Sequence, residues 1–204
     1  MRQCLGILLA GGLSRRMGGG DKPLLEICGR PILAHAIDRL APQCAALAIN
    51  ANGDPARFSQ FALPVVPDSV AGFAGPLAGI LAGMDHAAGQ GFTDIVSAPA
   101  DTPFLPTELV KSLYDSRKSA NARIAVAASG DRVHHAVALW PVSLREDLRR
   151  ALIEEDLRKV SAFIARHPNV TVEWPATPFD PFFNVNRPED LAAAAAIATA
   201  HERG

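Results

Sequence analysis

The feature that most constrains the fold of this chain is the order in which short apolar runs and helical patterns follow one another. Runs typical of buried strands occur at 5–9, 45–49, 65–66 and 94–98. Apolar residues spaced three and four apart predict helices at 31–40, 77–88 and 107–116. Repeated strand, loop and helix units predict a parallel sheet with helices on both of its faces.

The second half of the chain continues this pattern less regularly. We expect further strands at 124–128, 136–140 and 170–174. The first two could form a local antiparallel extension of the sheet. Thr107 is a plausible cap for the helix that follows it, and a last helix begins near Pro188. No linker-like or repetitive segment divides the chain. We therefore predict an α/β, Rossmann-like doubly wound fold with a mostly parallel sheet, in a single domain over residues 1–204.

Charge and cysteine content exclude several classes of protein. The formal net charge of −1 gives no overall attraction to nucleic acid or to anionic lipid, so we expect neither as a partner. The three cysteines form no C-x-x-C pair, which predicts reduced thiols rather than a disulfide framework. The first apolar run is too short for an export signal or a membrane span. We expect a cytoplasmic protein.

Polar or glycine-rich segments follow four of the predicted strands, at 10–22, 50–54, 67–76 and 99–103. In open parallel sheets, ligands bind beyond the carboxyl ends of the strands. We therefore expect these four segments to meet at one edge of the sheet and to form the ligand site there.

The first of these segments has the composition of a phosphate site. It contains five glycines, which permit close approach of the backbone to a ligand, together with Arg15, Arg16 and Lys22. Consecutive backbone amides can form a concave anion site, and the cations would add charge to phosphates held there. Neither the G-x-x-x-x-G-K-[ST] pattern nor the G-x-G-x-x-G fingerprint is present, so the loop is a phosphate site of another type.

The sequence from Leu9 to Lys22, LAGGLSRRMGGGDK, resembles the signature of the nucleotidyltransferases and in particular of the molybdenum cofactor guanylyltransferase family. The similarity extends over nearly the whole chain. It includes Gly29-Arg-Pro31 with His35, Asn50-Ala-Asn52, Asp68-Ser69, Gly75-Pro-Leu-Ala-Gly79, Asp101-Thr-Pro-Phe104, Phe183-Asn-Val-Asn186 and Pro188-Glu-Asp-Leu191. The number and order of these matches make the resemblance specific.

The resemblance implies a role for each matching residue. Catalytic groups would be Lys22, Arg16 and Asp101, with Asp101 also the ligand of Mg²⁺, the expected cofactor. The implied nucleotide contacts are Leu9, Ala10, Gly11, Gly12, Lys22, Asn50, Asp68, Gly79 and Asp101. Asn184 and Asn186, which alternate on an extended segment, would face the pterin.

Structural readings compete with several of these assignments. Asp101 could cap the helix that follows it, Asn50 could be a turn residue, and Asp68 could cap the next segment. His134 matches a family histidine, yet a satisfied structural histidine explains it as well. The chain also departs from the family pattern at Gly53, His135 and Arg187, which weakens the pterin assignment more than the nucleotide assignment.

The resemblance implies transfer of GMP from GTP to the terminal phosphate of the molybdopterin-bound cofactor, with release of pyrophosphate. A cytidylyltransferase acting on the same cofactor and a non-catalytic GTP-binding regulator are the alternatives. The implied partners are GTP, the molybdenum cofactor, proteins that deliver this cofactor and molybdoenzymes that receive the product. We expect the protein to be a monomer.

Overall fold

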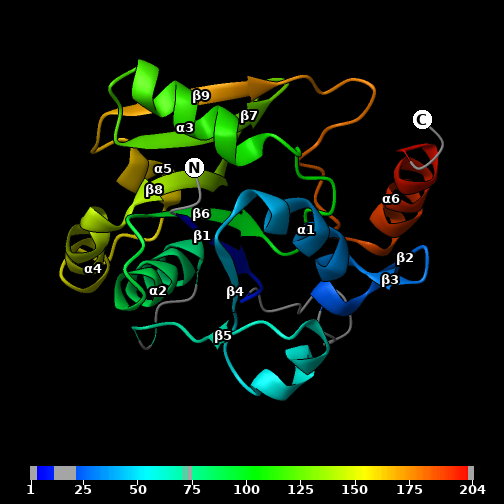
Figure 1. The fold of residues 1–204 in the computed structure, drawn as a ribbon, viewed down its shortest axis with the longest axis horizontal. Coiled ribbons are helices and arrows are strands. Elements are labelled where there is room, and N and C mark those ends of the chain that lie inside the picture. Colours follow the sequence, from blue (N-terminus) through cyan, green and yellow to red (C-terminus); the bar gives the residue numbers. More distant parts are fainter. Residues whose placement is uncertain (1–3, 12–21, 71, 73–74, 202–204) are drawn as a thin grey trace.

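A seven-stranded sheet forms the centre of the protein in a computed structural model, which describes residues 4–11, 22–70, 72 and 75–201 (Figure 1). The strands lie in the order β5 (Val65–Val66), β4 (Ala46–Asn50), β1 (Cys4–Leu9), β6 (Asp94–Pro99), β8 (Arg132–Pro141), β7 (Ile124–Ser129) and β9 (Asn169–Trp174).

The strand directions give the sheet a single functional edge. β5, β4, β1 and β6 are parallel, β8 is antiparallel to both β6 and β7, and β7 is parallel to β9. The mostly parallel sheet and the antiparallel extension are confirmed. The carboxyl ends of the other six strands and the amino end of β8 therefore lie along the same edge.

Helices cover both faces of the sheet because the side chains of a buried strand alternate between them. On one face, Cys4 and Leu8 of β1 pack with α1 (Ile32–Leu40) and α3 (Leu109–Ser119). On the other, Leu5 and Ile7 pack with α2 (Pro76–Gly89), α4 (Arg145–Ile153) and α5 (Val160–Ile164). The single-domain, doubly wound prediction agrees with this arrangement.

A smaller apolar cluster lies beside the sheet, where α6 (Pro188–His201) meets the hairpin of β2 (Glu26–Ile27) and β3 (Arg30–Pro31) (Figure 1). Its buried members are Ile27 from the hairpin, Ile32 from α1, Phe104, Val185, and Ala194 and Ala198 of α6. This cluster joins the C-terminal segment to elements near the N-terminus, and the hairpin was not predicted from the sequence.

The predicted cap Thr107 is wrong. The helix begins at Leu109, Glu108 is its N-cap residue, and no side chain caps it. The amide of Leu109 instead donates to the carbonyl of Pro106, so a backbone turn satisfies this helix end. Among the described residues, no helix has the length and apolar character needed to cross a membrane.

Candidate active site

The segments expected to meet at one edge do so wherever the structure describes them. β4 is hydrogen-bonded to β1 and β5, and β6 to β1, with Leu9 opposite both Asn50 and Pro99. The loops that leave these strands therefore start next to one another. They supply the polar groups of the candidate site.

Lys22, Asp101 and Asn186 form the central polar cluster of the site. Lys22, in a short 3₁₀ helix after the first loop, donates from Nζ to Oδ2 of Asp101 and, at 2.6 Å, to Oδ1 of Asn186. The side chains of Lys22 and Asp101 are 15% and 18% exposed, so solvent screens this ion pair only in part. The predicted meeting of Lys22 and Asp101 is thus seen directly.

Asp101 keeps one carboxylate oxygen free within this cluster. Its Oδ1 is buried and has no hydrogen-bond partner among the residues that the structure describes. An unpaired buried carboxylate oxygen is costly unless a donor or a cation satisfies it. No backbone amide of the described chain binds this side chain, so the helix-cap reading of Asp101 receives no support. Oδ1 instead suits a metal ion or a metal-bound water.

A second polar cluster lies at the ends of β4 and β5. Nδ2 of Asn50 donates to Oδ1 of Asp68 at 3.0 Å and to the carbonyl of Val66 at 3.1 Å. Asn52 binds the same aspartate twice, through Nδ2 to Oδ2 at 2.8 Å and through Oδ1 from the backbone amide at 2.9 Å. The two asparagines hold Asp68 in a fixed orientation, so Asn52 has a larger part in the site than its sequence position indicated.

The start of α2 approaches β1 and β4 so closely that only glycine fits at position 79. A Cβ atom built on Gly79 would collide with Oδ1 of Asn50 and lie 2.9 Å from Cδ2 of Leu9. Ala10 is tied to the same place, because its amide donates to the carbonyl of Asn50 at 2.8 Å. Gly11 is exposed beside them. The structure therefore brings Leu9, Ala10, Gly11, Asn50 and Gly79 together.

Part of the predicted phosphate loop lies outside the described residues. Gly12 and Arg16 belong to the range 12–21, so their expected roles stay predictions. The described residues on either side, Gly11 and Lys22, both lie at the carboxyl edge of the sheet.

Asn184 and Asn186 lie next to Asp101, and both side chains bind protein groups. Oδ1 of Asn184 accepts from Thr102 at 2.6 Å, and the amide of Val185 donates to the carbonyl of Asp101 at 3.1 Å. Val185 is fully buried between the two asparagines, which fits the predicted alternation. Thr102 was not singled out as a site residue; its position next to Asp101 in the Asp-Thr-Pro-Phe motif was the available signal.

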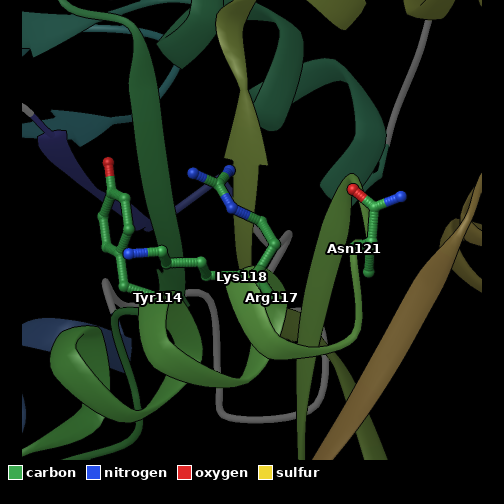
Figure 2. Close-up of a pocket in the computed structure, with 5 residues that line it drawn as sticks. Tyr114, Arg117, Lys118 and Asn121 are labelled. Carbon is green, nitrogen blue, oxygen red and sulfur yellow. The ribbon is translucent and has the colours of Figure 1, made fainter.

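A separate pocket of about 330 Å³ lies at the opposite end of β6, near Tyr114, Arg117, Lys118 and Asn121 (Figure 2). Figure 2 shows Tyr114 and Arg117 projecting from the C-terminal half of α3. Both of these side chains are bound to Asp94, Tyr114 through its hydroxyl and Arg117 as an ion pair, each at 2.6 Å. Two of the side chains that line this pocket therefore already have a structural partner, and the pocket lies away from the carboxyl edge.

Comparison with known proteins decides the family. The family model described as "MobA-like NTP transferase domain" matches residues 6–170. The chain belongs to the MobA-like NTP transferase family. This membership makes the protein a nucleotidyltransferase, and it confirms the resemblance that the sequence motifs indicated.

Close relatives and a solved structure support the same family. The chain is 59% identical to a molybdenum cofactor guanylyltransferase of Rhodopseudomonas palustris (strain BisB5), over 97% of this chain and 95% of the relative. A protein of the same name from Bradyrhizobium sp. (strain ORS 278) is 56% identical, over 97% and 94%. The crystal structure of molybdopterin-guanine dinucleotide biosynthesis protein A from Archaeoglobus fulgidus superposes with a TM-score of 0.72 at 25% identity, over 96% of this chain and 99% of that one.

Membership in this family is consistent with a divalent metal requirement, and the donor set at the site has one clear metal ligand. No group of three or more histidine, cysteine, aspartate or glutamate side chains gathers around a common point in the described part of the chain. Magnesium commonly binds through one or two carboxylates, with water and phosphate oxygens completing its shell. Asp101, with its unpartnered Oδ1, fits that mode of binding.

Proposed function

We propose that this nucleotidyltransferase transfers GMP from GTP to the terminal phosphate of molybdopterin-bound cofactor, giving the guanine dinucleotide and pyrophosphate. A phosphate oxygen of the acceptor attacks the α-phosphorus of GTP and forms the new P–O bond. The bond between the α-phosphorus and the bridging oxygen to the β-phosphate breaks, and both electrons leave with pyrophosphate. The acceptor phosphate is already ionised at neutral pH, so the reaction requires alignment and charge stabilisation rather than a strong base.

The observation that carries this proposal is the contact of Lys22 with Asp101 at the carboxyl edge of the sheet. An ammonium on a flexible stem can follow negative charge as it moves onto the leaving pyrophosphate. In the absence of substrate its charge is balanced by Asp101, and Asn186 holds it in place. Lys22 is thereby kept beside the position where the triphosphate would lie.

We propose that the second polar cluster and the closely packed start of α2 beside it recognise the nucleotide. Asn50, Asp68 and Gly79 would bind the guanosine part of GTP, with Leu9, Ala10 and Gly11 beneath it. Gly12 and Arg16 would bind the phosphates with Lys22. The amide Nδ2 groups of Asn184 and Asn186 would face the acceptor, since their Oδ1 atoms are bound to Thr102 and Lys22.

Asp101 is the residue proposed to hold Mg²⁺. When bound, the ion would neutralise charge on the triphosphate and orient it. A metal titration with magnesium, manganese and calcium, followed by removal with EDTA, tests the requirement. Retention of full activity in EDTA would contradict the role of Asp101 as a metal ligand.

Product analysis tests the proposed reaction. The protein is incubated with Mg²⁺, molybdopterin-bound cofactor and one of GTP, CTP, ATP or UTP, and the dinucleotide is identified by mass spectrometry while pyrophosphate is measured. We expect guanine dinucleotide and pyrophosphate in equal amounts from GTP. Preferential use of CTP would identify a cytidylyltransferase, and binding of GTP without pyrophosphate release would identify a regulator.

We also propose that the protein works as a monomer in the cytoplasm and passes its product to molybdoenzymes. Lys22, Asp101 and Asn186 of one chain already form the central cluster of the proposed site, which supports a monomer as the working unit. Light scattering at assay concentration tests the monomer. Direct transfer of the product to a recipient protein would be tested by pull-down of candidate molybdoenzymes with the dinucleotide bound.

A further inference from the structure

Three polar side chains, Ser129, His134 and Asp180, form a hydrogen-bonded cluster that the proposed phosphate chemistry does not use. Oγ of Ser129, at the end of β7, lies 2.7 Å from Nε2 of His134 and 2.6 Å from Oδ1 of Asp180. The amide of Phe182 donates to the same Oδ1 at 2.9 Å. Ser129 is 4% exposed, whereas His134 and Asp180 are half-buried and within reach of a ligand.

Counting protons in this cluster shows which hydrogen-bonding capacity is left for a ligand. A serine hydroxyl has one proton, and an ionised carboxylate only accepts, so Ser129 donates to Asp180. Nε2 of His134 must then carry a proton and donate to Oγ of Ser129. Burial lowers the pKa of His134, although the charge of Asp180 opposes this effect, so the imidazole is neutral near pH 7 and its Nδ1 is an acceptor.

Two acceptors therefore remain without a partner among the described residues: Oδ2 of Asp180 and Nδ1 of His134. The His134 ring packs on Phe182 with a centroid distance of 4.7 Å, and Trp174 packs edge-on against the same phenylalanine at 5.4 Å. Phe182 is buried, so this aromatic support is rigid. The cluster thus presents two acceptors, Oδ2 of Asp180, whose other oxygen is held by the amide of Phe182, and Nδ1 of His134, whose ring packs on Phe182.

The chain links this cluster to the reacting centre. The segment from Phe179 to Asn186 runs along the Asp101 loop, with the rings of Phe179 and Phe104 in edge contact at 5.7 Å. Further along the same segment, the side chain of Asn184 accepts a hydrogen bond from Thr102, and the amide of Val185 donates to the carbonyl of Asp101. The side chain of Asn186 accepts a hydrogen bond from Lys22. Asp180 thus lies at one end of a segment whose other end holds the catalytic lysine.

The order of the strands places the cluster on one side of the site. β8 pairs with β6 from Asp94–Pro141 to Ser97–Ala138, and a register shift against β7 separates this ladder from His134. Because β8 lies on the side of β6 away from β1 and β4, the cluster lies across the reacting centre from Asn50 and Asp68.

We propose that Asp180 and His134 bind the pterin ring of the acceptor through its 2-amino group and the adjacent ring N–H. A 2-amino-4-oxo pyrimidine ring presents these two donors side by side, and a carboxylate oxygen and an imidazole nitrogen are acceptors of the kind that such donors require. Guanine carries the same pair of donors. The site would therefore place one carboxylate on each side of Lys22, with Asp68 binding guanine and Asp180 binding the pterin. This inference rests on the proposed function, which supplies the class of acceptor.

The test compares steady-state kinetics of the wild type and Asp180→Asn with GTP, Mg²⁺ and molybdopterin as the acceptor. The amide keeps the shape of the side chain but can place a donor where the pterin requires an acceptor. We expect the KM for the acceptor to rise about tenfold or more, because a hydrogen bond to a charged group is lost, while the KM for GTP stays unchanged. The matched control is Asp131→Asn, an exposed aspartate in the turn between β7 and β8, which should leave both values unchanged.

A second variant separates ligand binding from folding. His134→Phe keeps the ring packed on Phe182 but removes the Nδ1 acceptor, and we expect it to raise the KM for the acceptor several-fold with GTP binding intact. The inference would be overturned if neither variant changed the KM for the acceptor, or if the KM for GTP rose as much as the KM for the acceptor. Either result would leave the proposed function in place. If the wild type transfers no GMP to molybdopterin, the proposed function itself fails.

Discussion

Asp94 and Asp101 lie at opposite ends of the same strand, and their surroundings differ. Asp94, the first residue of β6, accepts from Thr93 at 3.0 Å and from Tyr114 and Arg117 at 2.6 Å each. Asp101, just beyond the last residue of β6, has Lys22 on Oδ2 and no described partner on Oδ1.

The difference shows how a structural carboxylate can be told from one that is available for chemistry. Both are largely buried and both are paired with a cation, so burial and charge alone do not distinguish them. What distinguishes them is unused hydrogen-bonding capacity. Asp94 is satisfied by side chains of its own domain, whereas Oδ1 of Asp101 has no partner among the described residues and is open to a metal ion or a ligand.

The largest expected effect is on catalysis, from Asp101→Asn. The amide keeps the size of the side chain but removes the negative charge that would bind the metal and balance Lys22. We expect kcat to fall by at least about 10²-fold, with the thermal midpoint close to that of the wild type. Quenched-flow measurement of pyrophosphate release and differential scanning calorimetry provide the two readouts. Near-normal kcat would remove the distinction between the two aspartates.

Asp94→Asn should give the opposite result. Breaking a buried ion pair by removing one partner leaves Arg117 uncompensated, and we expect a loss of about 3 kcal/mol in the free energy of unfolding. Activity per folded molecule should be retained, because Asp94 lies at the far end of β6. Urea unfolding followed by circular dichroism measures the loss. The exposed aspartate of α3, in Asp115→Asn, is the control and should leave the unfolding midpoint unchanged.

Gly79→Ala tests the nucleotide half of the site. The added methyl group would collide with Oδ1 of Asn50, so we expect Asn50 and Asp68 to be displaced and the KM for GTP to rise about tenfold. The stability cost should be about 1–2 kcal/mol, because overpacking outweighs the better helix propensity of alanine. Isothermal titration calorimetry with GTP measures the affinity.

The matched control on the same helix is Gly89→Ala, where a Cβ atom meets nothing within 4 Å. This change should leave GTP affinity unchanged. Equal effects at positions 79 and 89 would show that α2 responds to any added methyl group and that close packing on Asn50 is unimportant.

The smallest expected effect is a pH dependence that arises in part at His134, on the carboxyl edge. Burial lowers the pKa of His134 below its usual value of about 6.5, so the folded protein binds fewer protons than the unfolded chain between these two values. Stability should therefore be constant above about pH 7 and should fall as the pH drops through this window. Near Asp94, burial raises the pKa of Tyr114, which stays protonated throughout.

Thermal unfolding between pH 5 and 8 checks this dependence. We expect His134→Phe to reduce the drop in midpoint by on the order of 1 °C, since the half-exposed histidine is partly screened by solvent. Burial also lowers the pKa of His167, so part of the acid dependence should remain in this variant. A drop in midpoint that His134→Phe leaves unchanged would place its origin elsewhere.

The parallel half of the fold and the meeting of Lys22 with Asp101 could be predicted, because each depends on local patterns and on strand direction. Strand ends carry their polar residues to one edge whatever the details of packing. α4 and α5 were missed because α5 has only five residues and because charged residues dominate the nine of α4.

Contacts between side chains that are distant along the chain have no local sequence pattern from which they could be predicted. Ser129 and Asp180 are 51 positions apart, and neither belongs to a motif that names the other. The same holds for Asn52, whose two hydrogen bonds to Asp68 depend on how β4 and β5 align. Tertiary packing decides these pairs, so sequence alone could place them only at the same edge.

The bond between Lys22 and Asn186 spans 164 positions of the chain, and this has a consequence for biosynthesis. A ribosome extrudes the strands that would hold GTP long before it reaches Asn186. Until that asparagine is made, Lys22 lacks this hydrogen bond in the growing polypeptide. Premature termination upstream of Asn186 would therefore leave a chain in which Lys22 has lost this partner.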